Sequence, residues 1–135
     1  MPLMEWTPSL SVNVKQFDEH HQHLFDLLNT LHDCMRVGKG REVVDEIVDA
    51  LADYAKKHFA AEELVMAKTN YLGLTAHRAE HRKFIATVDR IQKQSSDHRS
   101  VQTHEVISFL QGWLKNHIMK SDRAYGPHMV ANRIV

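Results

Sequence analysis

The sequence predicts an all-α protein, an antiparallel up-down four-helix bundle with an N-terminal arm and a short C-terminal tail. The 135 residues include only five glycines and three prolines, too few for a sandwich or barrel with many tight turns. Four long segments also repeat apolar residues at the three- and four-residue spacing of a helix face. Short links between these segments favour an antiparallel order of neighbouring helices.

The first two helices are separated by glycines. The first is expected over residues 17–35, where Asp18 supplies an acidic first turn, and Gly38 and Gly40 end it. The second is expected from about Glu42 to Met66. A turn-rich stretch at residues 70–75 ends the second helix.

The third helix is expected from about Thr75 to Gln94 and the fourth from about Val101 to Met119. The Ser95-Ser96-Asp97 cluster separates them. We therefore expect a single domain over residues 1–135, with an arm at 1–16, the bundle at about 17–120 and a tail at about 121–135. The arm is expected to pack on the outside of the bundle.

Composition excludes several classes of function. Seventeen basic residues balance seventeen acidic ones, so no basic excess exists to capture nucleic acid. No apolar run is long enough to insert into a membrane, and residues 1–7 lack the features of a signal peptide, so we expect a cytoplasmic protein. We also expect it to be a monomer. Cys34 is the single cysteine, which rules out an internal disulfide and a cysteine-based metal site.

Eleven histidines are several times the usual number for a chain of this length, and some of them fall in the apolar seams. On the third helix His77 and His81 continue the stripe of Phe84, Val88 and Ile91. This spacing places both imidazoles at core positions of the bundle.

The other helices carry polar residues in their seams too. His58 and Glu62 continue the stripe of the second helix, and His117 that of the fourth. On the first helix three histidines compete for a gap in the stripe. At about 100° per residue, His21 lies about 40° from the stripe, His20 about 60° and His23 about 120°. His21 is therefore the best inward candidate, with a modest margin over His20.

The inward side chains come from matching ends of the four helices and so lie at one level of an up-down bundle. Buried polar groups without partners cost about 1–3 kcal/mol each, and an unpaired carboxylate costs more. Imidazole nitrogens and carboxylate oxygens are good metal ligands, so a metal ion resolves the conflict. Solvent exposure is expected for the remaining histidines: His20, His23, His32, His98, His104 and His128.

The pattern resembles the hemerythrin family, specifically the single-domain bacteriohemerythrins. That family has one ligand histidine on the first helix, His-x3-Glu on the second, His-x3-His on the third and His-x4-Asp on the fourth. The matching residues of this chain are His21, His58, Glu62, His77, His81, His117 and Asp122. Asp122 lies five residues after His117, about 140° off that face of a regular helix. For both to reach one metal, the fourth helix must end or widen between them.

The resemblance implies two iron ions as the cofactor. His77, His81 and His117 would bind one iron, and His21 and His58 the other. Glu62 and Asp122 would bridge both irons, together with an oxo or hydroxo group. The second iron would keep one open position, where dioxygen would bind end-on as hydroperoxide.

The expected function is reversible binding of dioxygen for storage, transport or delivery, without enzymatic turnover. An oxygen-consuming enzyme is a candidate recipient of the delivered dioxygen. Apolar residues are expected to line the dioxygen pocket: Leu24, Phe25, Phe59, Trp113, Leu114 and Ile118. The alternatives are a di-iron enzyme that removes peroxide or nitric oxide, an oxygen sensor that acts through a partner, and a zinc hydrolase.

Overall fold

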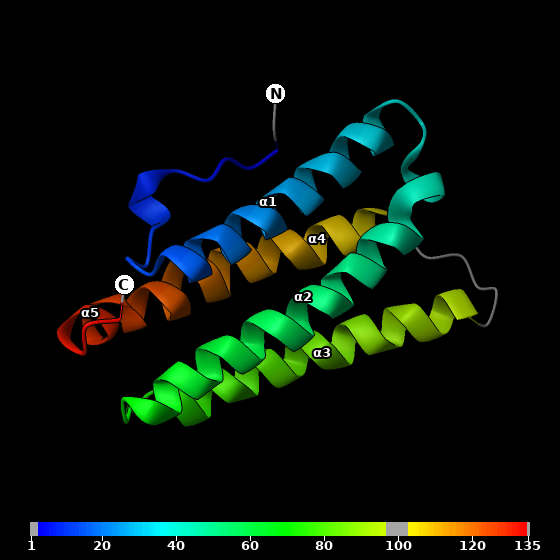
Figure 1. The fold of residues 1–135 in the computed structure, drawn as a ribbon. Helices are drawn as coiled ribbons and strands as arrows, with labels where there is room; N and C mark the ends of the chain where they lie inside the picture. Colours follow the sequence, from blue (N-terminus) through cyan, green and yellow to red (C-terminus); the bar gives the residue numbers. More distant parts are fainter. Residues whose placement is uncertain (1–2, 97–102, 135) are drawn as a thin grey trace.

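The computed structural model describes residues 3–96 and 103–134, which form helices and short connections without a strand. Four helices, α1 (Lys15–Arg36), α2 (Gly40–Lys68), α3 (Leu74–Ser96) and α4 (Thr103–Trp113), lie side by side and alternate in direction (Figure 1). α1 packs against α2 and α4, and α2 packs against α3. The predicted all-α antiparallel bundle is confirmed. No described helix is both long enough and apolar enough to cross a membrane.

The link between α1 and α2 depends on two glycines with different roles. Gly38 has φ 77°, a left-handed conformation that side chains disfavour, and it follows the end of α1. Gly40 begins α2 instead of only ending α1, and a Cβ built there would lie 2.9 Å from Thr103 Cγ2. Gly40 thus permits the close approach of α2 to the start of α4.

The connection between α3 and α4 also differs slightly from the sequence prediction. α3 extends to Ser96, through the first two residues of the predicted break. Asp97 and the expected start of the fourth helix at Val101 lie outside the described residues.

The fourth helix is much longer than the sequence predicts. α4 continues into a π-helical segment, η2 (Leu114–Asp122), and then into α5 (Arg123–Ala131). The expected tail is therefore helical as far as Ala131. The Gly126-Pro127 pair usually ends a helix, because glycine is flexible and proline lacks an N–H donor. Burial of Tyr125 and Met129 against the bundle offsets that preference.

The N-terminal arm packs on the outside of α1, as expected (Figure 1). After a short helical turn, η1 (Pro8–Leu10), it ends with Val12 and Val14 buried. The Met4 N–H donates to Asn29 Oδ1 at 3.0 Å, and Asn29 Nδ2 donates to the Met4 carbonyl at 2.7 Å. These paired hydrogen bonds fix the arm to the middle of α1.

Buried apolar side chains form two separate clusters. The larger fills the bundle over most of its length and includes Leu28, Leu51 and Leu110. The smaller lies at the end where the arm, α1, α2 and α5 meet, and we call it the end cluster. Its buried members are Val12, Val14, Phe17, Met66, Tyr125 and Met129.

Two glycine substitutions test the packing of α5 against the arm. A Cβ at Gly112, in α4, meets no atom within 4 Å, so Gly112→Ala is expected to stabilise the protein by about 0.5–1 kcal/mol. A Cβ at Gly126, in α5, lies 3.3 Å from the Val12 carbonyl oxygen, so Gly126→Ala is expected to gain less or to destabilise. Denaturant unfolding of both variants measures the difference. Equal stabilisation would contradict the described contact between the arm and α5.

Candidate metal centre

The seven side chains predicted as ligands converge in the structure. None is more than 3% exposed, and they lie at one level of the bundle. α1 contributes His21, α2 contributes His58 and Glu62, α3 contributes His77 and His81, and η2 contributes His117 and Asp122. Each helix thus places its polar seam residues where the up-down topology brings the four seams together.

The three candidates on α1 separate as their helical angles predict. His21 is fully buried, His20 is half-buried and His23 is exposed. The prediction that His21 is the histidine of α1 that points into the bundle is therefore confirmed by its burial. The small angular margin between His21 and His20 also has a structural consequence, since His20 contacts the site from outside.

The π-helical segment solves the geometric problem posed by His117 and Asp122. A π-helix forms hydrogen bonds between residues five apart, so its turn is wider than that of an α-helix. Residues 117 and 122 consequently lie one above the other, and His117 Nε2 is 3.0 Å from Asp122 Oδ1. Of the two alternatives left by the sequence, the helix widens and does not end.

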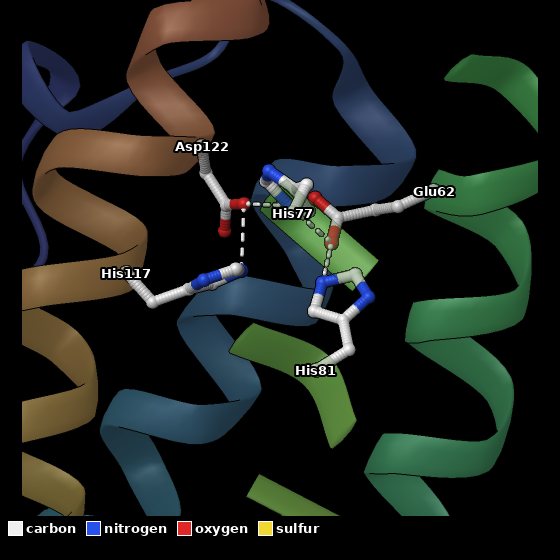
Figure 2. A group of neighbouring side chains, drawn as sticks. All are labelled: Glu62, His77, His81, His117 and Asp122. Carbon is white, nitrogen blue, oxygen red and sulfur yellow. Dashed lines mark ion pairs between the residues drawn. The ribbon is translucent and has the colours of Figure 1, made fainter. Parts of the chain in front are cut away.

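The ligand atoms form two overlapping sets, each within 4.8 Å. The three-histidine set, shown in Figure 2, comprises Glu62, His77, His81, His117 and Asp122. The two-histidine set comprises His21, His58, Glu62 and Asp122. The two carboxylates belong to both sets, which is the arrangement expected of residues that bridge two ions.

Asp122 divides its two oxygens between the sets. Its Oδ1 lies 2.8 Å from His77 Nε2 and 3.0 Å from His117 Nε2, whereas its Oδ2 lies 3.0 Å from His21 Nε2. One oxygen thus faces each metal position.

Glu62 also contacts both sets. Its Oε1 lies 3.1 Å from His58 Nε2 and 3.2 Å from His81 Nε2. Its Oε2 faces His21 Nε2 at 4.0 Å and accepts a hydrogen bond from the Tyr125 hydroxyl.

These residues fit a metal pair on the evidence of their unsatisfied atoms. Within residues 3–96 and 103–134, the Nε2 atoms of His21, His77, His81 and His117 are buried without a hydrogen-bond partner. Glu62 Oε1 and both Asp122 oxygens are likewise buried without a hydrogen-bond partner. Donors bonded to one ion at about 2.1 Å stand about 3 Å apart, close to the separations in this site. Such a donor set suits cations that accept nitrogen and oxygen ligands.

The electrostatics of the metal-free site favour charge pairs. Burial alone would lower the pKa of His77, but the neighbouring carboxylates of Asp122 and Glu62 raise it to about 10. Burial likewise opposes the charge on His21, yet Asp122 raises its pKa. Burial would raise the pKa of the Glu62 carboxyl, but His58 holds it well below its usual range. Protonated imidazoles therefore stand beside ionised carboxylates, and a metal has to displace those protons.

Three groups behind the predicted ligands were missed by sequence reasoning. The Tyr125 hydroxyl donates to Glu62, and burial, followed by the charge of Glu62, raises the tyrosine pKa well above its usual range. Glu63 Oε2 lies 3.3 Å from His81 Nδ1, and Glu80 Oε1 lies 3.1 Å from His117 Nδ1. For Glu63 and Glu80 the one sequence signal is that each stands next to a predicted ligand, in Glu62-Glu63 and in Glu80-His81.

The expectation of solvent exposure is correct for His23 and His104 and wrong for three other histidines. His20, His32 and His128 are half-buried, and His98 lies outside the described residues. Sequence periodicity missed the contacts of His20 and His128 because they lie between elements rather than on a core stripe. His128 Nε2 forms a hydrogen bond with Thr69 Oγ1 at 2.8 Å.

His20 is likewise half-buried through a contact with another helix, since its Nδ1 lies 2.7 Å from His58 Nδ1 on α2. Burial lowers the pKa of His20, and the positive charges of His58 and His21 lower it further.

The residues expected to line a dioxygen pocket are all buried in the larger apolar cluster: Leu24, Phe25, Phe59, Trp113, Leu114 and Ile118. Two of them stack on ligands of the three-histidine set. The Phe59 ring lies 3.8 Å from that of His81, and the Trp113 ring lies 3.9 Å from that of His117. Beside the two-histidine set, Tyr54 stacks on His58 at 5.0 Å, a contact the sequence did not indicate.

Comparison with known proteins agrees with this geometry. A family model described as the hemerythrin HHE cation binding domain matches residues 12–129. A bacteriohemerythrin from Methylococcus capsulatus is 37% identical over 132 residues, which cover 97% of this chain and 100% of the relative. A hemerythrin-like protein from Naegleria gruberi is 32% identical over 120 residues, covering 89% and 88% of the two chains.

A solved structure agrees in fold as well as in sequence. The crystal structure of a wild-type hemerythrin superposes with a TM-score of 0.80 at 38% identity, covering 93% of this chain and 96% of that one. The matched range of the family model spans all seven converging side chains. The chain belongs to the hemerythrin family.

Proposed function

We propose that this protein binds dioxygen reversibly at a non-haem di-iron centre and so stores, transports or delivers it. The observation that carries the proposal is the pair of overlapping buried ligand sets that share Glu62 and Asp122. Two ferrous ions held there would supply two electrons, which lets dioxygen bind and leave without an external reductant. His77, His81 and His117 would hold one ion and His21 and His58 the other.

The unequal ligand sets support a position for dioxygen on one side of the centre. With both carboxylates shared, the three-histidine set offers five protein ligands and the two-histidine set offers four. We therefore place the open position on the side of His21 and His58. Dioxygen bound there end-on is the finer form of this proposal.

The residues of the chain have three tasks in this function. Five imidazoles and two carboxylates would hold the ions, and Tyr125 fixes Glu62 by donating a hydrogen bond to it. The buried apolar side chains, among them Leu24 and Leu114, exclude water and anions from the open position.

The donor set supports carriage over catalysis. Di-iron carboxylate proteins draw a glutamate from each of two helices and a Glu-x-x-His pair from each of the others. This site has more histidine and fewer carboxylates, a set that disfavours highly oxidised iron. We therefore propose that the protein is not an enzyme.

One experiment separates the candidate functions. Metal analysis is expected to give two irons per chain, and admission of air to the ferrous protein is expected to produce an absorption spectrum that reverses under inert gas. Steady consumption of peroxide or nitric oxide without a stable oxygenated form would favour an enzyme instead. Zinc without iron would exclude the proposal.

Substitution of His77 tests the ligand assignment. His77→Ala removes one nitrogen from the three-histidine set. The remaining ligands of that set are expected to hold their ion less tightly, so the iron content should fall well below two per chain. His104→Ala is the control, since His104 is exposed on α4. Metal analysis after purification measures the effect. Full iron content in the His77 variant would contradict its role as a ligand.

Substitution of Leu114 tests the exclusion of water. Leu114 is fully buried, and Leu114→Ala is expected to retain both irons but to shorten the lifetime of the oxygenated protein. Leu31→Ala is a matched control, because Leu31 is equally buried but lies about 15 Å further along α1 than His21. Decay of the absorption spectrum in air measures the lifetime. An unchanged lifetime in the Leu114 variant would argue against a sealing role.

The raised pKa of His77 predicts how the metal-free protein responds to pH. A group whose pKa rises from 6.5 to about 10 on folding stabilises the folded state fully below pH 6.5 and loses this contribution as the pH rises through about 10. The melting temperature of the metal-free protein is therefore expected to be lower at pH 9 than at pH 6.5. Metal ions compete with the same protons, so the loaded protein should not lose stability over this range. Thermal unfolding of both forms at the two pH values measures this, and an equally stable metal-free protein at pH 9 would refute it.

A further inference from the structure

The ligand histidines differ in what faces the back of each ring. In the three-histidine set, His81 Nδ1 lies 3.3 Å from Glu63 Oε2 and His117 Nδ1 lies 3.1 Å from Glu80 Oε1. Two ligands of that set therefore face carboxylates.

Both of these carboxylates are themselves held in place. Arg78 Nε donates to Glu63 Oε1 at 3.0 Å, and the Ser121 hydroxyl donates to Glu80 Oε1 at 2.8 Å. The two acceptors are therefore fixed parts of the structure.

The two-histidine set has no such carboxylate among the described contacts. His58 Nδ1 lies 2.7 Å from His20 Nδ1, and His21 Nδ1 is buried without a hydrogen-bond partner in the described part of the chain. One metal position thus has carboxylates behind its ligands, and the other has one imidazole.

His20 is held against His58 by its surroundings. Its ring meets that of His58 edge-on, at 4.8 Å and 89°, and lies 6.4 Å from the Phe17 ring. A surface pocket of about 320 Å³ between α1 and α2 reaches this contact, and His23 also lines it. His20 therefore joins the buried ligand to a place that solvent can reach.

The contact fixes where the protons lie. A histidine that binds a metal through Nε2 carries its proton on Nδ1 and donates it to a neighbour. For His58 that acceptor is the lone pair of His20 Nδ1, so the proton of His20 lies on its own Nε2. A carboxylate acceptor makes the ligand more basic, whereas a neutral imidazole does so less. His58 is consequently a weaker donor than His81 or His117.

We propose that His20 is a positioning residue that orients His58 through this hydrogen bond and leaves the two-histidine position with the more weakly bound, more electrophilic metal ion. The proposal rests on the proposed function for the presence of two ions at the site. According to this proposal, the two metal positions differ in binding strength because of the acceptor behind His58 as well as because of their number of ligands.

Release of iron to a chelator tests the proposal in four variants and the wild-type protein. Protein loaded with Fe²⁺ under anaerobic conditions is mixed with an excess of a coloured ferrous chelator, and two release phases of equal amplitude are expected. His20→Leu removes the acceptor and is expected to accelerate the faster phase by about 10- to 100-fold while the slower phase is unchanged. His23→Leu is the matched control in the same pocket and should behave as wild type.

Two further variants separate positioning from mere packing. His20→Gln supplies a neutral oxygen acceptor and should restore the release rate to within a few-fold of wild type. His20→Glu supplies a carboxylate like those behind His81 and His117, and it should slow the faster phase below the wild-type rate. A role in packing alone gives no reason for glutamate to slow release. If the glutamate variant releases iron no more slowly than the glutamine variant, the proposal is overturned. This comparison remains valid even if His20→Leu fails to fold.

A measurement on the wild-type protein provides an independent test. In nitrogen-15 NMR of the Zn²⁺-loaded protein, the His58 proton should lie on Nδ1 and exchange slowly with solvent, unlike the ring protons of His23. A His58 proton that exchanges as fast as those of His23 overturns the proposal, as does a single release phase in the wild type.

These measurements need bound metal but not dioxygen, so the two proposals can fail separately. A wild-type protein that shows the expected release order but no reversible dioxygen spectrum would refute the proposed function and support the role of His20.

Discussion

The structure depends on the burial of two carboxylates, Glu62 and Asp122, neither of which is exposed to solvent. An uncompensated carboxylate in the core of a small bundle would lower the free energy of unfolding by a large fraction of its total, which is about 5–15 kcal/mol for a typical protein. Five imidazole nitrogens from four helices surround the two groups. In the metal-free protein His77 and His21, whose pKa values are raised, compensate by binding protons, and in a loaded protein cations would take that place. The same side chains therefore explain both the stability of the bundle and its capacity to bind metal.

The π-helical segment is the backbone feature that makes this convergence possible. In a regular helix His117 and Asp122 would diverge by about 140°, and one of the two carboxylates would leave the site. The wider turn of η2 aligns them, and α5 then continues in a direction that carries Tyr125 to Glu62. A single local departure from α-helical geometry thus brings His117, Asp122 and Tyr125 together at the site.

The parts of the site that sequence predicted are those with a periodic signal. His77, His81, His58 and His117 continue apolar stripes, so their burial follows from spacing alone, and His21 follows from its angle. Asp122 breaks the α-helical period, and only the family resemblance pointed to it. The carboxylates of Glu63 and Glu80 gave no such signal, because partly exposed acids on a helix surface look like ordinary solvated residues. Their role depends on which ring nitrogen faces them, which only the packed structure reveals.

The end cluster explains why the chain continues past the last predicted ligand. The site lies near one end of the bundle, and four helices alone would leave it facing solvent at that end. Tyr125 and Met129 from α5, Val12 and Val14 from the arm, and Phe17 cover that end with apolar surface. Tyr125 belongs to this cover and also donates to Glu62, so the cover and the ligand cluster form one packed unit. The larger apolar cluster encloses the site from the other side, which places the charged groups between two apolar layers. The arm and α5, which contribute no predicted ligand, are therefore required for the low-dielectric environment in which the seven side chains act.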